Sequence, residues 1–126
     1  MYLSLFFTGL TAALLAYGAN RLVVGLWGQR AVALLVPAIE ELAKTGLAVV
    51  MNQPLLGVHI IFGLLEAIYD ARKGGQARWS ASLASIVGHG FFGLLTFSLA
   101  RGSLPLAIGA AWLVHALWNS CTLLFE

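Results

Sequence analysis

The sequence predicts an all-α fold, a polytopic transmembrane bundle of about five helices. Of the 126 residues, 60% are apolar and only 10% are charged, whereas an ordinary soluble domain has roughly 25% charged residues. The apolar residues gather in stretches close to the roughly 20 residues that a helix needs to cross a bilayer. The length allows one domain, and the scarcity of polar surface favours an integral membrane protein.

Polar and turn-forming residues divide the chain into successive spans. The breaks fall at residues 20–30, 52–54, 70–78 and 101–103. They leave five expected spans, at residues 2–19, 31–52, 55–70, 80–100 and 104–125. Because the first span lacks the basic residues that begin a secretory signal, we expect it to be retained. We therefore expect an N-terminal transmembrane helix with an interfacial connector over 1–30, and a four-helix core over 31–126.

The basic residues of the loops are unevenly shared between the two sides of the membrane. Only Arg101 lies on one side, and the other side has Arg21, Arg30, Arg72, Lys73 and Arg78. Since basic loops stay in the cytoplasm, the sequence predicts an outside N-terminus and a cytoplasmic C-terminus. These residues form no stripe or cluster of the kind that nucleic-acid-binding proteins carry, so we expect no nucleic-acid partner.

Three ionisable residues stand inside the second expected span. Glu40, Glu41 and Lys44 are the charged residues of that span. A charged side chain at the bilayer centre costs about 2.5–3.5 kcal/mol or more, so such residues usually face the bundle interior and mark a functional site. Lys44 lies within one helical turn of both carboxylates and can pair with either.

Each of the last four spans carries a polar stripe, since side chains three, four and seven residues apart share a helix face. The second span contributes the two glutamates and the lysine. The stripes of the next three spans contain, in order, His59 and Glu66, then Ser85 and His89, then His115 and Asn119. Every stripe runs along an otherwise apolar helix, so the four stripes are expected to face one another.

Four of these residues are expected at the same depth in the membrane. At roughly 1.5 Å per helical residue, Glu40 and His89 lie about 14 Å from the start of their spans, and Glu66 and His115 about 16 Å. The apolar core of a bilayer is about 30 Å thick, so all four lie near its middle. The sequence therefore predicts one shared polar site.

Small residues around His89 predict close packing of the fourth helix. Ser85, Gly88, Gly90 and Gly93 lie within four residues of it, and small side chains let helices approach in a membrane. In the second span, Pro37 has no backbone N–H to donate. A carbonyl one turn before the glutamates therefore lacks its helical hydrogen bond. A free carbonyl is compatible with a water-lined cavity.

Each of these residues also has a purely structural interpretation. Glu40, Glu41 and Lys44 would then form a buried ion pair that fixes helix packing, although packing alone needs no second carboxylate. Glu66 would be a packing hydrogen-bond partner, and a single buried histidine is as often a satisfied core residue as a catalytic one. For His59, which is expected nearer the outer surface, we favour the core interpretation.

The set of side chains suits hydrolysis of an amide bond by activated water. A buried glutamate beside an ammonium can act as a general base near neutral pH. His115 and Asn119 lie one turn apart and are suitable donors to a developing oxyanion. The sequence has no Gly-x-Ser-x-Gly motif, and no serine has an obvious base on its own helix, which disfavours serine chemistry.

The same residues would suit a zinc ion. His89 and His115 with Glu66 or Glu40 supply three ligands and leave an open position for water. The His-Glu-x-x-His motif of many metalloproteases is absent. The sequence leaves open whether a glutamate or Zn²⁺ activates the water, and the preferred glutamate version needs no cofactor.

In their order along the chain, the motifs resemble those of the PrsW-type glutamic intramembrane proteases, which are related to the CAAX prenyl endopeptidase and ABI family. The resemblance covers about residues 31–125 and consists of Glu40-Glu41-x-x-Lys44, Phe62-x-x-x-Glu66 with Tyr69, His89, and His115-x-x-x-Asn119. It implies a multi-pass endopeptidase of a prokaryotic cell membrane that cuts membrane proteins or peptides.

The resemblance also implies roles for single residues. Glu40 and Glu41 would hold the catalytic base, with Glu40 preferred. His115 and Asn119 match the oxyanion motif. Glu66 stands where the CAAX branch has a histidine, so His89 is the natural substitute as the residue that steers the water.

Two other classes of protein would also use buried charges. A small proton- or cation-coupled transporter would use the carboxylates as relays, and with five spans it is expected to work as a homodimer. A non-catalytic membrane protein would keep the site to bind a ligand. Cleavage of a membrane substrate separates the protease from both, and metal content separates the two versions of the protease.

Overall fold

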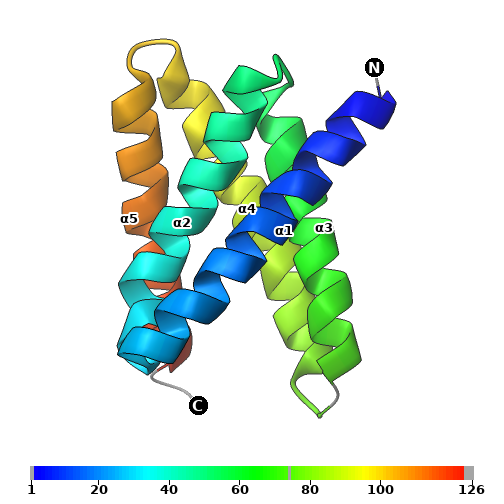
Figure 1. Ribbon diagram of the computed structural model, residues 1–126, viewed down its shortest axis with the longest axis vertical. Coiled ribbons are helices and arrows are strands. Elements are labelled where there is room, and N and C mark those ends of the chain that lie inside the picture. Colours follow the sequence, from blue (N-terminus) through cyan, green and yellow to red (C-terminus); the bar gives the residue numbers. More distant parts are fainter. Residues whose placement is uncertain (1, 74, 124–126) are drawn as a thin grey trace.

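The computed structural model describes residues 2–73 and 75–123, and these residues form a bundle without any β-strand. The five helices, drawn in Figure 1, are α1 (Tyr2–Trp27), α2 (Gln29–Val50), α3 (Leu55–Lys73), α4 (Arg78–Ala100) and α5 (Leu104–Leu123). The predicted all-α fold is therefore confirmed. The bounds of α2 to α5 agree closely with the expected spans, except that residues 124–126 lie outside the described residues.

The first helix is longer than predicted. It continues through the expected interfacial connector to Trp27, and the single residue Gly28 separates it from α2. Gly28 has a φ of 65°, a conformation that glycine adopts without steric cost. The residues after Asn20 are mostly apolar and include no proline, so the helical pattern of α1 has no reason to stop before this glycine.

The helices form two groups that meet at one end of the bundle. α3 and α4 make an antiparallel hairpin, α2 lies beside α5, and α1 crosses obliquely over α2 and α3 (Figure 1). Toward the end where α1 finishes, the α3–α4 hairpin diverges from α1, α2 and α5 (Figure 1). The basic residues expected in the cytoplasm belong to this diverging end.

α3 and α4 approach each other through two glycines, each of which faces a histidine of the other helix. A Cβ added at Gly63 would lie 2.8 Å from the Cβ of His89, and one added at Gly93 would lie 2.6 Å from the Cβ of His59. The expected close approach at Gly93 is thus confirmed. Gly90, in contrast, has nothing within 4 Å of an added Cβ, so it does not contribute to this contact.

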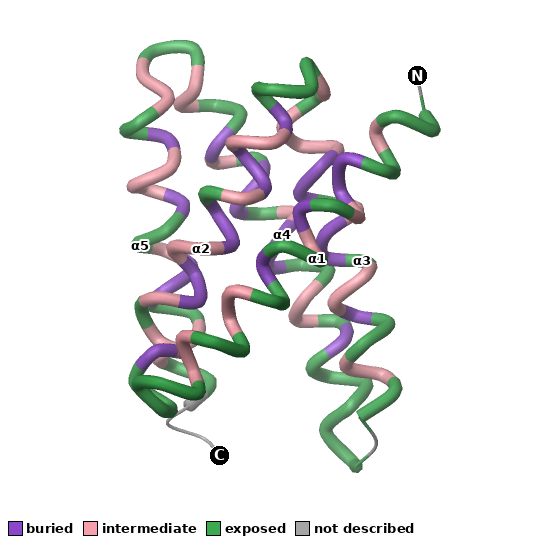
Figure 2. Tube along the Cα trace, in the orientation of Figure 1, coloured by how far each residue is buried: buried purple, intermediate pink, exposed green. Residues whose placement is uncertain are grey.

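The outside of the bundle is apolar. Large side chains such as Leu22, Leu26 and Val50 are exposed, while the buried residues follow the inward faces of the helices (Figure 2). Three helices, α1, α4 and α5, are long and apolar enough to cross a membrane. α2 and α3 contain more charged residues than these three helices, so they are less apolar. Apolar surface outside and charge inside is the pattern of a membrane protein.

Candidate functional site

The polar stripes of four helices meet in the interior as one cluster of ionisable side chains. Its members from α2 are Glu40, Glu41 and Lys44, and α3, α4 and α5 add His59, Glu66, His89 and His115. All except Glu66 are buried. The structure thus brings together the four residues that sequence reasoning placed at one depth.

Glu41 is bonded to three side chains from three helices. Its Oε1 accepts hydrogen bonds from Nζ of Lys44 at 2.7 Å and from Nδ1 of His115 at 2.9 Å. Its Oε2 lies 3.1 Å from Nε2 of His59, whose Nδ1 lies 2.9 Å from the carbonyl oxygen of Leu55. A carbonyl only accepts, so Nδ1 of His59 carries a proton and a second proton lies between Nε2 and Glu41. Glu41 therefore fixes the positions of α3 and α5 relative to α2.

Lys44 determines which ring nitrogen of His89 carries the proton. Its ammonium lies 2.8 Å from Nδ1 of His89 and 4.7 Å from the centre of the Phe62 ring, a favourable cation–π distance. An ammonium only donates, so Nδ1 of His89 accepts and its Nε2 carries the hydrogen. That N–H donates to Oε2 of Glu66 over 2.6 Å. The two partners thus hold His89 in one neutral tautomer.

Glu40 has one satisfied oxygen and one unsatisfied oxygen. Its Oε1 accepts a hydrogen bond from Nδ2 of Asn20 at 2.9 Å, whereas its buried Oε2 has no hydrogen-bond partner. That Oε2 lies 3.8 Å from Nε2 of His115 and 3.9 Å from Nε2 of His89. An unsatisfied buried acceptor costs about 1–3 kcal/mol, and more when charged. The position therefore favours a donor molecule between Glu40 and the two rings.

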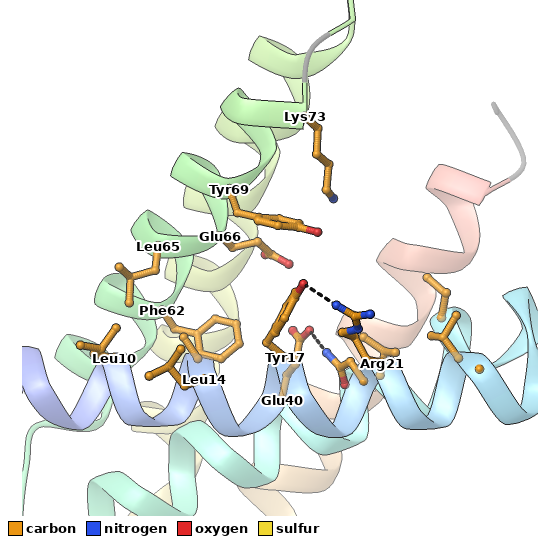
Figure 3. A pocket seen from close by; sticks show the side chains of 16 residues that line it. Leu10, Leu14, Tyr17, Arg21, Glu40, Phe62, Leu65, Glu66, Tyr69 and Lys73 are labelled. Atoms are coloured by element: carbon orange, nitrogen blue, oxygen red, sulfur yellow. Dashed lines mark hydrogen bonds between the residues drawn. The ribbon is translucent and has the colours of Figure 1, made fainter.

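Two cavities meet at the carboxylates. A cavity of about 750 Å³ lies between α1, α2 and α3, and Figure 3 shows its lining side chains. A second cavity, of about 540 Å³, lies among α2, α3, α4 and α5 and includes His89, His115 and Asn119. Glu40 and Glu66 line both, and the Glu66 side chain is 35% exposed. A ligand in either cavity can therefore reach these carboxylates.

Asn119 and Trp112 dock α5 onto the proline-containing part of α2. Nδ2 of Asn119 donates to the carbonyl oxygen of Val32 at 3.1 Å, and Nε1 of Trp112 donates to that of Leu34 at 2.9 Å. These carbonyls flank the one that Pro37 deprives of its helical donor. An asparagine amide has two N–H groups, so Asn119 keeps a second one on the wall of the smaller cavity.

Sequence reasoning missed two members of this arrangement. His59 is a satisfied core histidine, as predicted, but its partner is Glu41, which makes it part of the cluster. Its position on the same stripe as Glu66 was the available signal. Asn20 was assigned to the connector; because α1 continues past it, its side chain reaches Glu40.

Three of the buried side chains have possible ligand atoms close enough together to hold a metal ion. Ligand atoms of Glu40, His89 and His115 all lie within 4.8 Å of one another. The unpartnered Oε2 of Glu40 fits, and so does Nε2 of His115, because Nδ1 of that ring donates to Glu41 as in carboxylate–histidine–metal sites. Nε2 of His89 does not fit, since it carries the hydrogen given to Glu66. It can bind a metal only if that hydrogen moves to Nδ1, which the ammonium of Lys44 beside Nδ1 opposes.

Comparison of the chain with protein-family models, curated proteins and solved structures finds no match. The function proposed below therefore rests on the chain's own residues. These are the buried cluster, the unpartnered oxygen of Glu40 and the two cavities that reach it.

Proposed function

We propose that the chain is an intramembrane endopeptidase in which Glu40 activates water to attack a peptide bond of a membrane-associated substrate. The observation that supports this is the unpartnered Oε2 of Glu40, buried where two cavities meet. A general base must lie within hydrogen-bond reach of the proton it removes. This oxygen has no hydrogen-bond partner, whereas each oxygen of Glu41 has at least one.

The water is held between two acceptors. Oε2 of Glu40 and Nε2 of His115 are 3.8 Å apart, a separation that one water molecule bridges by giving one hydrogen to each. Its lone pair is then free to attack the carbonyl carbon. The water gives one proton to Glu40 as it attacks. Glu40 later donates this proton to the amine that leaves when the C–N bond breaks.

The remaining residues support this step. His89 gives its N–H to Glu66 and fixes one wall of the water site. Lys44, bonded to Glu41 and His89, offsets part of the negative charge in the cluster. The second N–H of Asn119 is the proposed donor to the oxyanion, a contribution worth about 10²–10³ in turnover in other hydrolases.

Sequence order and charge support the same proposal. The motif order resembles that of the PrsW-type proteases, which implies a multi-pass protein of a prokaryotic cell membrane. We propose that all five helices cross the bilayer. The diverging end, which holds Arg30, Arg72 and Arg78 at the ends of their helices, then faces the cytoplasm by the positive-inside rule. The N-terminus is outside in this arrangement.

A metal-dependent version would use the same site. Glu40 and His115 would hold a zinc ion, and His89 would join them after losing its Nε2 hydrogen. When bound, zinc lowers the pKa of its water and polarises a carbonyl. In this version Glu41 would orient His115 through Nδ1, as it does in the structure.

Proton-coupled transport is the second candidate function. The observation that favours it is an unbroken series of hydrogen bonds through the bundle, running Glu66–His89–Lys44–Glu41–His59. Such series serve as proton relays in membrane proteins. Proton flux into liposomes without any cleavage would favour this function, and cleavage of a single-pass membrane reporter that is lost in Glu40→Gln would favour the protease.

A further inference from the structure

We propose that Arg21 and Lys73 form a subsite for an acidic residue of the substrate, about two to three residues from the bond that is cut. The inference rests on the proposed function and specifies the substrate: an apolar segment with a carboxylate side chain near the cytoplasmic surface.

The two cations lie on opposite walls of the larger cavity. Arg21 belongs to α1 and Lys73 to the end of α3, and both line the cavity that leads to Glu40 and Glu66. Figure 3 shows their charged ends directed into the same space, with the two glutamates deeper inside. A ligand that reaches the glutamates through the larger cavity therefore lies close to both cations.

Both cations have donors to spare. Among the described residues no carboxylate pairs with Arg21, whose guanidinium donates to the hydroxyl of Tyr17 at 3.5 Å. Lys73 donates to Asp70 at 2.9 Å, yet its side chain is 57% exposed. A guanidinium has five N–H donors and an ammonium has three. At the cavity mouth, two positively charged groups therefore have unused N–H donors that could bind an anion.

The rest of the wall suits apolar side chains. Past the glutamates, on the side away from the cations, the cavity is lined by residues that include Leu10, Leu14, Phe62 and Leu65 (Figure 3). The rings of Tyr17 and Tyr69 meet edge to face across it, with their centres 5.7 Å apart. An extended peptide would place apolar side chains on these walls and its acidic residue at the mouth.

The spacing follows from Asn20, the residue before Arg21. Its amide touches Glu40 at 2.9 Å. Because adjacent Cα atoms are about 3.8 Å apart and an arginine side chain extends several ångströms further, the guanidinium of Arg21 is on the order of 7–10 Å from the proposed base. At roughly 3.3 Å per extended residue, this distance corresponds to about two to three residues. The acidic residue is thus expected at that separation from the scissile bond.

The smaller cavity fixes the direction of the substrate. Its lining contains the acidic residues Glu40, Glu66 and Asp70, and among the described residues it includes no lysine or arginine. A carboxylate there would face like charges, which repel it. The acidic side of the substrate is therefore directed between α1 and α3, and the other side toward α4 and α5.

Binding of matched peptides tests the subsite without requiring cleavage. The probes are fluorescent apolar peptides that differ only in one residue, Glu, Gln or Lys, moved along the sequence. They are titrated onto the Glu40→Gln protein in neutral detergent micelles. We expect the best Glu peptide to bind about tenfold more tightly than its Gln counterpart, the size of one hydrogen bond to a charged group.

Substitution of the two cations tests whether they cause the preference for the Glu peptide. In the Glu40→Gln background, Arg21→Gln and Lys73→Gln should each remove most of this preference, and Arg21→Glu should favour the Lys peptide. Arg72→Gln is the matched control, because it removes the same charge from the same end of the molecule but does not line the cavity. Equal binding of the Glu, Gln and Lys peptides, or no binding of any, would overturn the subsite. So would a preference that survives both Gln variants.

Lipid competition and cleavage separate the remaining outcomes. Displacement of the Glu peptide by phosphatidylglycerol but not by phosphatidylcholine would show that the cations hold a lipid headgroup, and would overturn the subsite. If peptide binding depends on charge but wild type never cleaves the peptides, the result would support the subsite and contradict the endopeptidase. Cleavage by wild type without charge preference would leave the endopeptidase and overturn the subsite.

Discussion

The ammonium of Lys44 lies 2.8 Å from Nδ1 of His89, and this contact decides how His89 can act. Because an ammonium cannot accept a hydrogen bond, His89 presents an N–H at Nε2 and gives it to Glu66. The ring therefore offers no acceptor nitrogen toward the water site, whereas Nε2 of His115 is an acceptor there. A charged Lys44 thereby favours water held by Glu40 and His115 over a three-ligand metal.

The first prediction concerns metal. We expect purified wild type to contain less than one zinc per chain and to keep its cleavage rate after dialysis against a chelator. Elemental analysis and the reporter rate measure the two quantities. Lys44→Met should bind zinc more tightly than wild type, because it releases Nδ1 of His89. Loss of cleavage on chelation that zinc restores would contradict this account.

Removal of Lys44 should destabilise the protein. Lys44→Ala leaves Glu41 without its cation in the bundle interior, and breaking a buried pair in this way costs about 3–5 kcal/mol. Activity should be lost as well. The comparison is Lys73→Ala, which breaks a partly exposed pair with Asp70 and should cost about 0–1 kcal/mol. An unchanged melting temperature for Lys44→Ala would argue that this lysine faces water.

The glycines between α3 and α4 should tolerate no side chain. An added Cβ at Gly63 would lie 2.8 Å from the Cβ of His89 and 3.0 Å from the backbone oxygen of Ser85. Gly63→Ala and Gly93→Ala should therefore each cost about 1–3 kcal/mol, as overpacking does. Gly90→Ala, which meets nothing within 4 Å, should be neutral or slightly stabilising. Equal effects at all three positions, measured by unfolding, would argue against this helix contact.

Asn119 and Trp112 allow helix docking to be separated from catalysis. Both donate to carbonyls of α2, but only Asn119 is proposed to serve the oxyanion. Asn119→Ala should lower turnover by roughly 10², with KM little changed. Trp112→Phe should lower stability and leave turnover nearly intact. If the two variants lose turnover equally, the role of Asn119 is docking.

The sequence predicted which residues of α2 to α5 would meet, because helical period and depth are simple geometry. Glu40, Glu66, His89 and His115 were placed near one level, and the structure joins them. The polar stripes alone did not show which side chains of the cluster would be hydrogen-bonded to one another. Glu41 and Glu40 are neighbours in the chain, yet one is fully bonded and the other keeps a vacant oxygen, since helix rotation and packing decide between them.

The first helix was less predictable for a physical reason. Asn20 and Arg21 look like a loop boundary, because polar residues usually end a span. Both instead lie on a continuing helix, where Asn20 faces Glu40 and Arg21 faces the larger cavity. Only the packing of α1 across α2 and α3 reveals that Asn20 reaches Glu40 and that the exposed Arg21 lines the larger cavity.

The central claim is that the vacant oxygen of Glu40 is the base. The most direct measurement is cleavage of single-pass membrane reporters by reconstituted wild type, Glu40→Gln and Glu41→Gln, each checked for folding. We predict that wild type cuts, that Glu40→Gln is folded and inactive, and that Glu41→Gln loses stability because it breaks bonds to Lys44, His59 and His115. Cleavage by folded Glu40→Gln at the wild-type rate would contradict the account.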